Sequence, residues 1–199
     1  MIDYNDYETI VRIKKNPTYE NCVIPLWDKF KQVILDESDY DGLDVFVQKV
    51  VEQKLVEKGH EVDNQKEEKR WTTGQQGEIV VGKFLGLKVA DYTVGESKMY
   101  NYADLKKHDI KCGIKTVEYG KFPLIKKGYK EPEIIVIKKS KYEFYIAGLA
   151  TPLYMSLYHS DNLVLDSNLR AKNYKTGFYG FFKLEQFNNI DELKILCND

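Results

Sequence analysis

Hydrophobic and polar positions follow two different periods along the chain, and the change comes after Gly86. Before it, apolar residues recur every three or four positions, which is typical of amphipathic helices. The spacing predicts a helix over 26–34 and a second helix over 41–58 that ends at Gly59. Residues 1–70 are therefore predicted to form a helical N-terminal region packed on the core of the protein.

A third predicted helix carries the first candidate for chemistry. Thr73 and Gln76 fit a capping box at its start. Glu78 follows on this helix, with Gly74 and Gly82 four residues away on either side. Residues four apart share one face of a helix, and glycine there costs about 1 kcal/mol relative to alanine. A carboxylate between two such positions indicates either a closely approaching ligand or a tight contact between helix and strand.

Beyond the third helix the pattern favours strands and turns. Residues 71–199 are predicted to form an α/β core. The fold class is α+β, with a mixed sheet of about four to five strands flanked by helices. Strands are predicted over 102–106, 110–119, 133–137, 142–149 and 177–182, the fourth pairing back on the third, and helices over 151–158 and 189–196.

Composition narrows the functional class. The chain has 199 residues, 43% of them apolar and 31% charged, which is typical of one soluble globular domain. Three scattered cysteines provide neither a disulfide framework nor a zinc site. The sequence contains no P-loop, no dinucleotide-binding glycine motif and no nucleophile elbow. No apolar stretch is long enough to span a membrane, so no membrane contact and a cytoplasmic location are expected.

Charge is unevenly distributed, although the net charge is only −1. Residues 1–70 carry 16 acidic and 11 basic residues, whereas 97–145 contain 12 lysines and six acidic residues. Such a basic stretch indicates either a polyanion-binding surface or a lysine-rich solvated surface. Because lysine acts as a point charge on phosphate, DNA would be bound mainly through its backbone. The candidate DNA-binding residues are Lys106, Lys107, Lys111, Lys172 and Lys175.

The candidate chemistry is an acid on a helix followed by an acid and a lysine on strands. Glu78 comes first, Asp104 second, and Lys115 third, within Gly113-Ile114-Lys115-Thr116. Over residues 72–183 this order resembles the PD-(D/E)XK nuclease superfamily, in particular divergent members carried by bacteriophages or other mobile elements. The resemblance implies a restriction-endonuclease-like fold and divalent-metal-dependent hydrolysis of DNA, with these three residues in catalytic roles.

A nuclease of this kind would use Mg²⁺ or Mn²⁺, which prefer carboxylate and water ligands. The predicted metal ligands are Glu78, Asp104 and Asp109. Lys115 would orient or deprotonate the attacking water and stabilise the developing charge. If the site is assembled, the functional atoms of Glu78, Asp104 and Lys115 should lie within about 4–8 Å of one another. The sequence is also compatible with a homodimer.

The sequence departs from the family pattern at Gly113, where an acidic residue is expected. Asp109 is the first candidate to replace it, because it lies between Asp104 and Lys115, and Glu118 and Glu133 are the second and third. Asp109 could instead be the strand acid itself, with Asp104 peripheral. In a third interpretation catalysis is lost. The chain would then be an inactive nuclease-fold protein that binds nucleic acid or a host protein, such as a phage regulatory or anti-defence protein.

Overall fold

The computed structural model describes residues 2–56, 67–94 and 103–198. Its central sheet has four strands in the order β1-β5-β4-β2. β2 and β4 are parallel, whereas β5 is antiparallel to both of its neighbours. The predicted α+β class with a mixed sheet is therefore confirmed. The strand bounds are β1 Lys31–Ile34, β2 Gly113–Glu118, β4 Glu133–Lys138 and β5 Glu143–Ala150.

A second, antiparallel sheet has the order β3-β7-β6. The pattern does not predict β3 (Leu124–Lys126) or β6 (His159–Ser160), because strands of three and two residues are too short to show an alternation. The strand predicted over 177–182 is shifted. β7 spans Lys175–Phe178, and a 3-10 turn follows over Phe181–Lys183.

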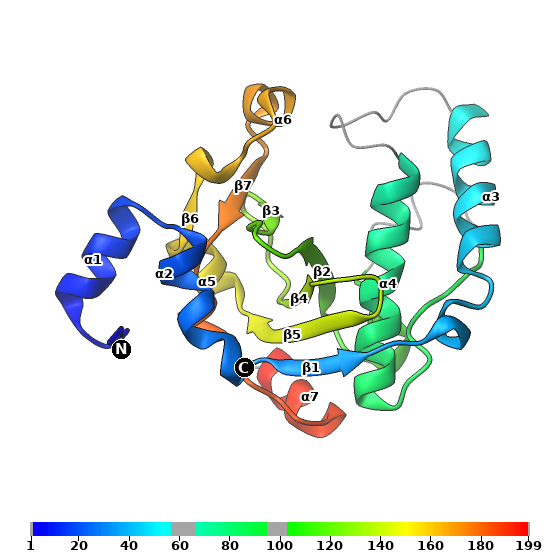
Figure 1. Cartoon of the computed structure of the whole chain (residues 1–199), viewed down its shortest axis with the longest axis horizontal. Helices are drawn as coiled ribbons and strands as arrows, with labels where there is room; N and C mark the ends of the chain where they lie inside the picture. The colour runs from blue at the N-terminus through cyan, green and yellow to red at the C-terminus, as the bar shows by residue number, and fades with distance from the viewer. Residues whose placement is uncertain (1, 57–66, 95–102, 199) are drawn as a thin grey trace.

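One face of the central sheet is covered by α4 (Glu67–Leu85), which packs against β2. α3 (Leu43–Val56) packs on the outer side of α4, so that the two helices stand next to each other (Figure 1). α7 (Ile190–Asn198) contributes Leu193 to the core on this face. The predicted helix over 41–58 is confirmed as far as Val56, and its end at Gly59 lies outside the described residues.

The other face is covered by α1 (Tyr7–Lys15), α2 (Tyr19–Cys22) and α5 (Pro152–Leu157), together with the second sheet (Figure 1). α6 (Ser167–Lys172) precedes β7. Ile13 and Leu26 of the N-terminal region are buried in one cluster with Ile135 and Ile137 of β4. Helical residues of the N-terminal region therefore pack on the sheet, whereas β1 of the same region is one of its strands, so the predicted wholly helical region is not found.

The predicted helix over 26–34 is wrong in its second half. A 3-10 turn covers Ile24–Lys29, and the chain then extends as β1, an edge strand of the central sheet. Val33 and Leu35 are buried while Ile34 is 54% exposed, which is the period of a strand. The five apolar residues in these nine positions fit both the period of a helix and the period of a strand. Pairing with β5 selects the strand.

α4 begins at Glu67, six residues before the predicted capping box. Thr73 is buried inside the helix and is not its N-cap. The first turns are held by side chains of the helix itself, since the carboxylate of Glu67 accepts hydrogen bonds from Arg70 and Trp71. Gly86, with a φ of +67°, follows the last helical residue as predicted.

The close approach to α4 occurs mainly at a glycine that the sequence does not single out. At Gly77 a Cβ would lie 1.8 Å from the hydroxyl oxygen of Thr116 on β2, so only glycine allows this helix and strand to pack. At Gly82 the approaching group is the chain itself, the carbonyl oxygen of Leu87. Nothing lies within 4 Å of a Cβ at Gly74. The tight contact between helix and strand is therefore at Gly77, and neither Gly74 nor Gly82, the two glycines of the prediction, meets a strand.

No helix within the described residues is long and apolar enough to cross a membrane.

Candidate functional site

Asp104 lies in a turn, and the predicted strand over 102–106 is not formed; residue 102 itself is outside the described residues. The chain turns sharply here because Leu105 and Ile110 both enter the core, leaving four polar residues between them for a 3-10 turn. Asp104 and Lys115 are therefore not on two strands of a hairpin. β2 pairs with β4, in parallel.

The Asp104 carboxylate is nevertheless fixed to the start of β2. Its Oδ2 accepts a hydrogen bond of 2.5 Å from the backbone N–H of Ile114. Asp104 reaches solvent, yet the protein around it raises the pKa of its carboxyl to about 6, mainly by desolvation and in part through the charge of Glu133. The Ile114 hydrogen bond and the positive charge of Lys115 act in the opposite direction and lower this pKa. The charge of Lys115 thus acts electrostatically on the Asp104 carboxyl.

The two faces of β2 separate the predicted site residues. Consecutive side chains of a strand point to opposite faces. Ile114 faces α4, because its Cγ2 would lie 3.3 Å from a Cβ at Gly77. Gly113 and Lys115 therefore belong to the opposite face, the one on which Val117 joins the core with α1 and α2. Lys115 points away from the helix that carries Glu78.

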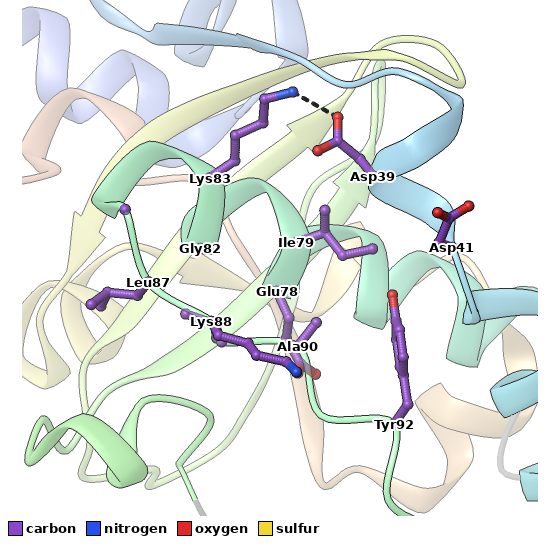
Figure 2. A pocket seen from close by; sticks show the side chains of 12 residues that line it. Asp39, Asp41, Glu78, Ile79, Gly82, Lys83, Leu87, Lys88, Ala90 and Tyr92 are labelled. Carbon is purple, nitrogen blue, oxygen red and sulfur yellow. Dashed lines mark hydrogen bonds and ion pairs between the residues drawn. The ribbon is translucent and has the colours of Figure 1, made fainter.

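Glu78 lines a pocket of about 430 Å³ between α4 and the segment 86–92. Figure 2 shows its side chain directed from α4 toward Ala90 and Tyr92, whereas Lys83 points away from it to an ion pair with Asp39. The Oε1 of Glu78 accepts a hydrogen bond of 2.7 Å from the amide of Gln75, one turn earlier in the helix.

The electrostatic environment of Glu78 disfavours its ionised form. Desolvation holds the pKa of its carboxyl well above the usual range, and the negative charges of Asp104 and Asp91 raise it further. Asp104 is thus a neighbour of Glu78 as well as of Lys115. The three predicted residues are therefore not all linked to one another. Asp104, next to the start of β2, interacts electrostatically with Glu78 and with Lys115.

Glu133 shares the face of Lys115 and lies beside Gly113. The two residues are register partners in the parallel pair of β2 and β4. A Cβ at Gly113 would lie 3.6 Å from Cγ of Glu133, 3.8 Å from Oδ2 of Asp104 and 3.8 Å from the hydroxyl of Tyr129. That hydroxyl donates a hydrogen bond of 3.0 Å to Glu131. The sequence places Glu133 third among the candidates for the missing acid, at the beginning of an apolar strand, and its register with Gly113 is set by the strand pairing.

The two other candidate acids do not face this site. Asp109 is exposed and ends the 3-10 turn in the left-handed conformation, with a φ of +60°. Glu118 follows Lys115 by three residues on β2, so its side chain points to the opposite face, toward α4. There it forms ion pairs with Lys69 and Lys121, which lower the pKa of its carboxyl to about 2. The predicted ligand set of Glu78, Asp104 and Asp109 is not assembled.

Within residues 2–56, 67–94 and 103–198, no group of three or more His, Cys, Asp or Glu side chains is placed to hold a metal ion. Comparisons of the chain with protein-family models, with curated proteins and with solved structures find no match. Function is therefore inferred from the residues and their geometry alone.

The predicted DNA-binding lysines fall into two groups. Lys106 and Lys107 belong to the turn after Asp104, and Lys111 is exposed just before β2. Lys107 forms an ion pair with Asp91.

The second group lies on the smaller sheet. Lys172 ends α6, and Lys175 begins β7 directly opposite Lys126 of β3. These two lysines present positive charge on the same face of the strand pair. The segment after β3 leads through Tyr129 to Glu133, so this lysine pair is connected to the candidate site by a short stretch of chain.

Replacing Glu78 with glutamine is expected to raise the melting temperature at pH 7. Desolvation and the charges of Asp104 and Asp91 disfavour ionisation of this carboxyl in the folded protein, whereas an uncharged amide avoids this penalty and can still accept the hydrogen bond from Gln75. A raised pKa means that stability is fully present below the unfolded value of 4.5 and is lost as the pH rises through the folded value. The advantage of the variant should therefore grow from pH 4 to pH 7. Calorimetry across this range measures it, and equal melting curves at pH 7 would contradict it.

Proposed function

We propose that the protein is a divalent-metal-dependent nuclease that hydrolyses phosphodiester bonds in DNA at the start of β2. The observation that carries the proposal is the pairing of Asp104 with Lys115 around Gly113. Asp104 lies beside Gly113 at the solvent-accessible start of β2, its carboxyl has a pKa of about 6, and the charge of Lys115 acts on that carboxyl. Perturbed acids next to a charged partner are typical of functional sites.

The residues suit the chemistry of phosphodiester cleavage. Asp104 is oriented by the backbone N–H of Ile114, so its second oxygen is free to bind a cation or a water. Lys115 supplies a positive charge toward a scissile phosphate and can orient the attacking water. When bound, Mg²⁺ or Mn²⁺ supplies Lewis-acid polarisation of phosphate and activation of water. Desolvation and the charge of Glu133 raise the pKa of the Asp104 carboxyl to about 6.

Two groups of lysines favour DNA as the substrate. The first follows Asp104 in the chain, and the second includes the facing pair Lys126 and Lys175. A phosphate backbone could lie along the face on which these two lysines stand opposite each other. Because lysines bind phosphate without reading bases, little sequence preference is expected.

The proposal is tested with purified protein, supercoiled plasmid and linear duplex DNA. Nicking or shortening is expected with Mg²⁺ or Mn²⁺ and is expected to stop with EDTA. The logarithm of the DNA affinity should fall linearly with the logarithm of the salt concentration, since each phosphate contact releases counterions. The double variant Lys126→Glu and Lys175→Glu should weaken binding and reduce this salt slope.

Gly113 and the lack of a three-acid group among the described residues favour one second candidate, an inactive relative that only binds. Salt-dependent DNA binding without cleavage under any metal condition would replace the nuclease with this candidate. Absence of both DNA binding and cleavage would overturn the nuclease proposal. The inactive relative would then have a host protein, not DNA, as its partner.

A further inference from the structure

The carboxylate of Glu133 is buried without being satisfied. The residue is only 9% exposed, and its Oε2 has no hydrogen-bond partner in the described part of the chain. A buried acid normally has hydrogen bonds, an opposite charge or a metal ion to compensate for lost hydration. Glu133 therefore points to a ligand that supplies positive charge at this position.

The space beside Glu133 is bounded by a second carboxylate. Glu133 opens β4 next to Gly113 of β2, and a Cβ at Gly113 would be in van der Waals contact with both Glu133 and Asp104. The missing side chain thus leaves the gap between the two acids open. The negative charge of Glu133 raises the pKa of Asp104, which shows that the two carboxylates interact. Two acids held so close are unfavourable unless a cation lies between them.

We infer that Asp104 and Glu133 form a two-carboxylate site for a hard divalent cation, Mg²⁺ or Mn²⁺. Glu133 supplies from β4 the acid that Gly113 lacks on β2. Mg²⁺ keeps several of its waters and is commonly bound by one or two carboxylates plus substrate phosphate, so a third acidic ligand is not needed. The inference deepens the proposed function and rests on it for the role of the cation.

The placement of the other acids supports this assignment. Glu118 is neutralised by two lysines on the α4 face, and Asp109 ends the exposed turn. Glu78 reaches Asp104 from the α4 side, whereas Glu133 lies on the side of Lys115. Only Glu133 combines proximity to Asp104, a shared face with Lys115 and an unsatisfied oxygen.

Because β2 and β4 pair in parallel, an acid on β4 can take the place of the acid that is missing on β2. In a parallel pair, residues in register lie side by side on the same face. The side chain of Glu133 can therefore occupy the space that an acid at position 113 would fill. Gly113 also has room for a side chain, since no atom lies closer than 3.6 Å to its Cβ and its φ is not in the left-handed region.

The test moves the acid between the two strands and measures metal binding directly. Mn²⁺ is titrated into the parent, into Glu133→Gln, and into the double variant Glu133→Ala with Gly113→Glu, by calorimetry and by electron paramagnetic resonance of the free ion. Glu133→Gln should lose at least about 10-fold in affinity, since even outer-shell changes cost about 10–100-fold. The double variant should recover most of the parent affinity. Glu143→Gln, the same change at a partly exposed acid of β5 far along the strand from the register partner of Glu133, is the matched control and should bind as the parent does.

Each result has a definite meaning. Mn²⁺ binding that Glu133→Gln leaves unchanged, or that Asp109→Asn abolishes instead, overturns the inference, and so does a parent that binds no Mn²⁺. Binding that depends on Glu133 in a protein that never cleaves DNA supports the site and refutes the nuclease. Cleavage that survives in Glu133→Gln supports the nuclease and refutes the site. Gln has the size of Glu, and the melting curve of each variant verifies that it is folded.

Discussion

Replacing Lys115 with methionine is expected to reduce metal-dependent DNA cleavage by about 10²- to 10⁴-fold, the range associated with loss of a group that handles protons or charge in the transition state. Methionine keeps the length of the side chain and removes only its charge. Lys115 has no hydrogen-bond or ion-pair partner among the described residues, so the melting temperature should change little. Cleavage rates on plasmid at saturating Mg²⁺ measure the effect.

A second readout separates a role in catalysis from a role in structure. The charge of Lys115 repels a cation at Asp104, so Lys115→Met should bind Mn²⁺ at least as tightly as the parent while cleaving far more slowly. Lys49→Met on the exposed side of α3 is the matched control and should retain full activity. If Lys115→Met cleaves at the parent rate, the assigned site is wrong. If it loses metal binding and stability together, Lys115 supports the fold and not the chemistry.

Elements with one unambiguous period could be predicted from the sequence. The stripe over 41–58 gives α3, and the continuous apolar run over 133–137 gives the buried strand β4 followed by its partner β5. β1 could not be predicted because its apolar residues also fit a helix. The start of α4 was missed because polar residues before Thr73 form a solvated extension whose stability comes from contacts within the helix.

The candidate site shows a different limit of local patterns. Asp104 and Lys115 were chosen from their order in the chain, and in the structure the charge of Lys115 lowers the pKa of the Asp104 carboxyl. The acid that lies beside Gly113, however, depends on a pairing between strands separated by residues 119–132, and parallel pairing leaves no signature in a short sequence. A hairpin would have favoured Asp109. The parallel pair favours Glu133 instead, because it sets these two residues side by side.

Gly148→Ala is expected to destabilise the protein by about 3–5 kcal/mol, through backbone strain and overpacking together. Gly148 has a φ of +134°, a conformation that residues with a side chain rarely adopt, and it lies where the register of β4 and β5 shifts. A Cβ there would lie 2.7 Å from the carbonyl oxygen of Glu185 and 2.8 Å from the amide nitrogen of Gln186. Thermal unfolding of the variant should occur about 6–20 °C below that of the parent, by the scaling for a chain of this size.

The clash cannot be relieved cheaply, because the groups around Gly148 are themselves hydrogen-bonded to β5. Leu149 and Glu185 exchange two backbone hydrogen bonds, of 2.8 and 3.0 Å, and the Gln186 side chain donates to the carbonyl of Ala147. Moving this segment to admit a methyl group would break contacts on both sides of the central strand. Gly74→Ala is the matched control, since nothing lies within 4 Å of its Cβ and the helix should gain about 1 kcal/mol. A Gly148→Ala protein that melts with the parent would show that β5 can adopt an ordinary extended backbone at this position. The strand register that sets Glu133 beside Gly113 would then have to be determined anew.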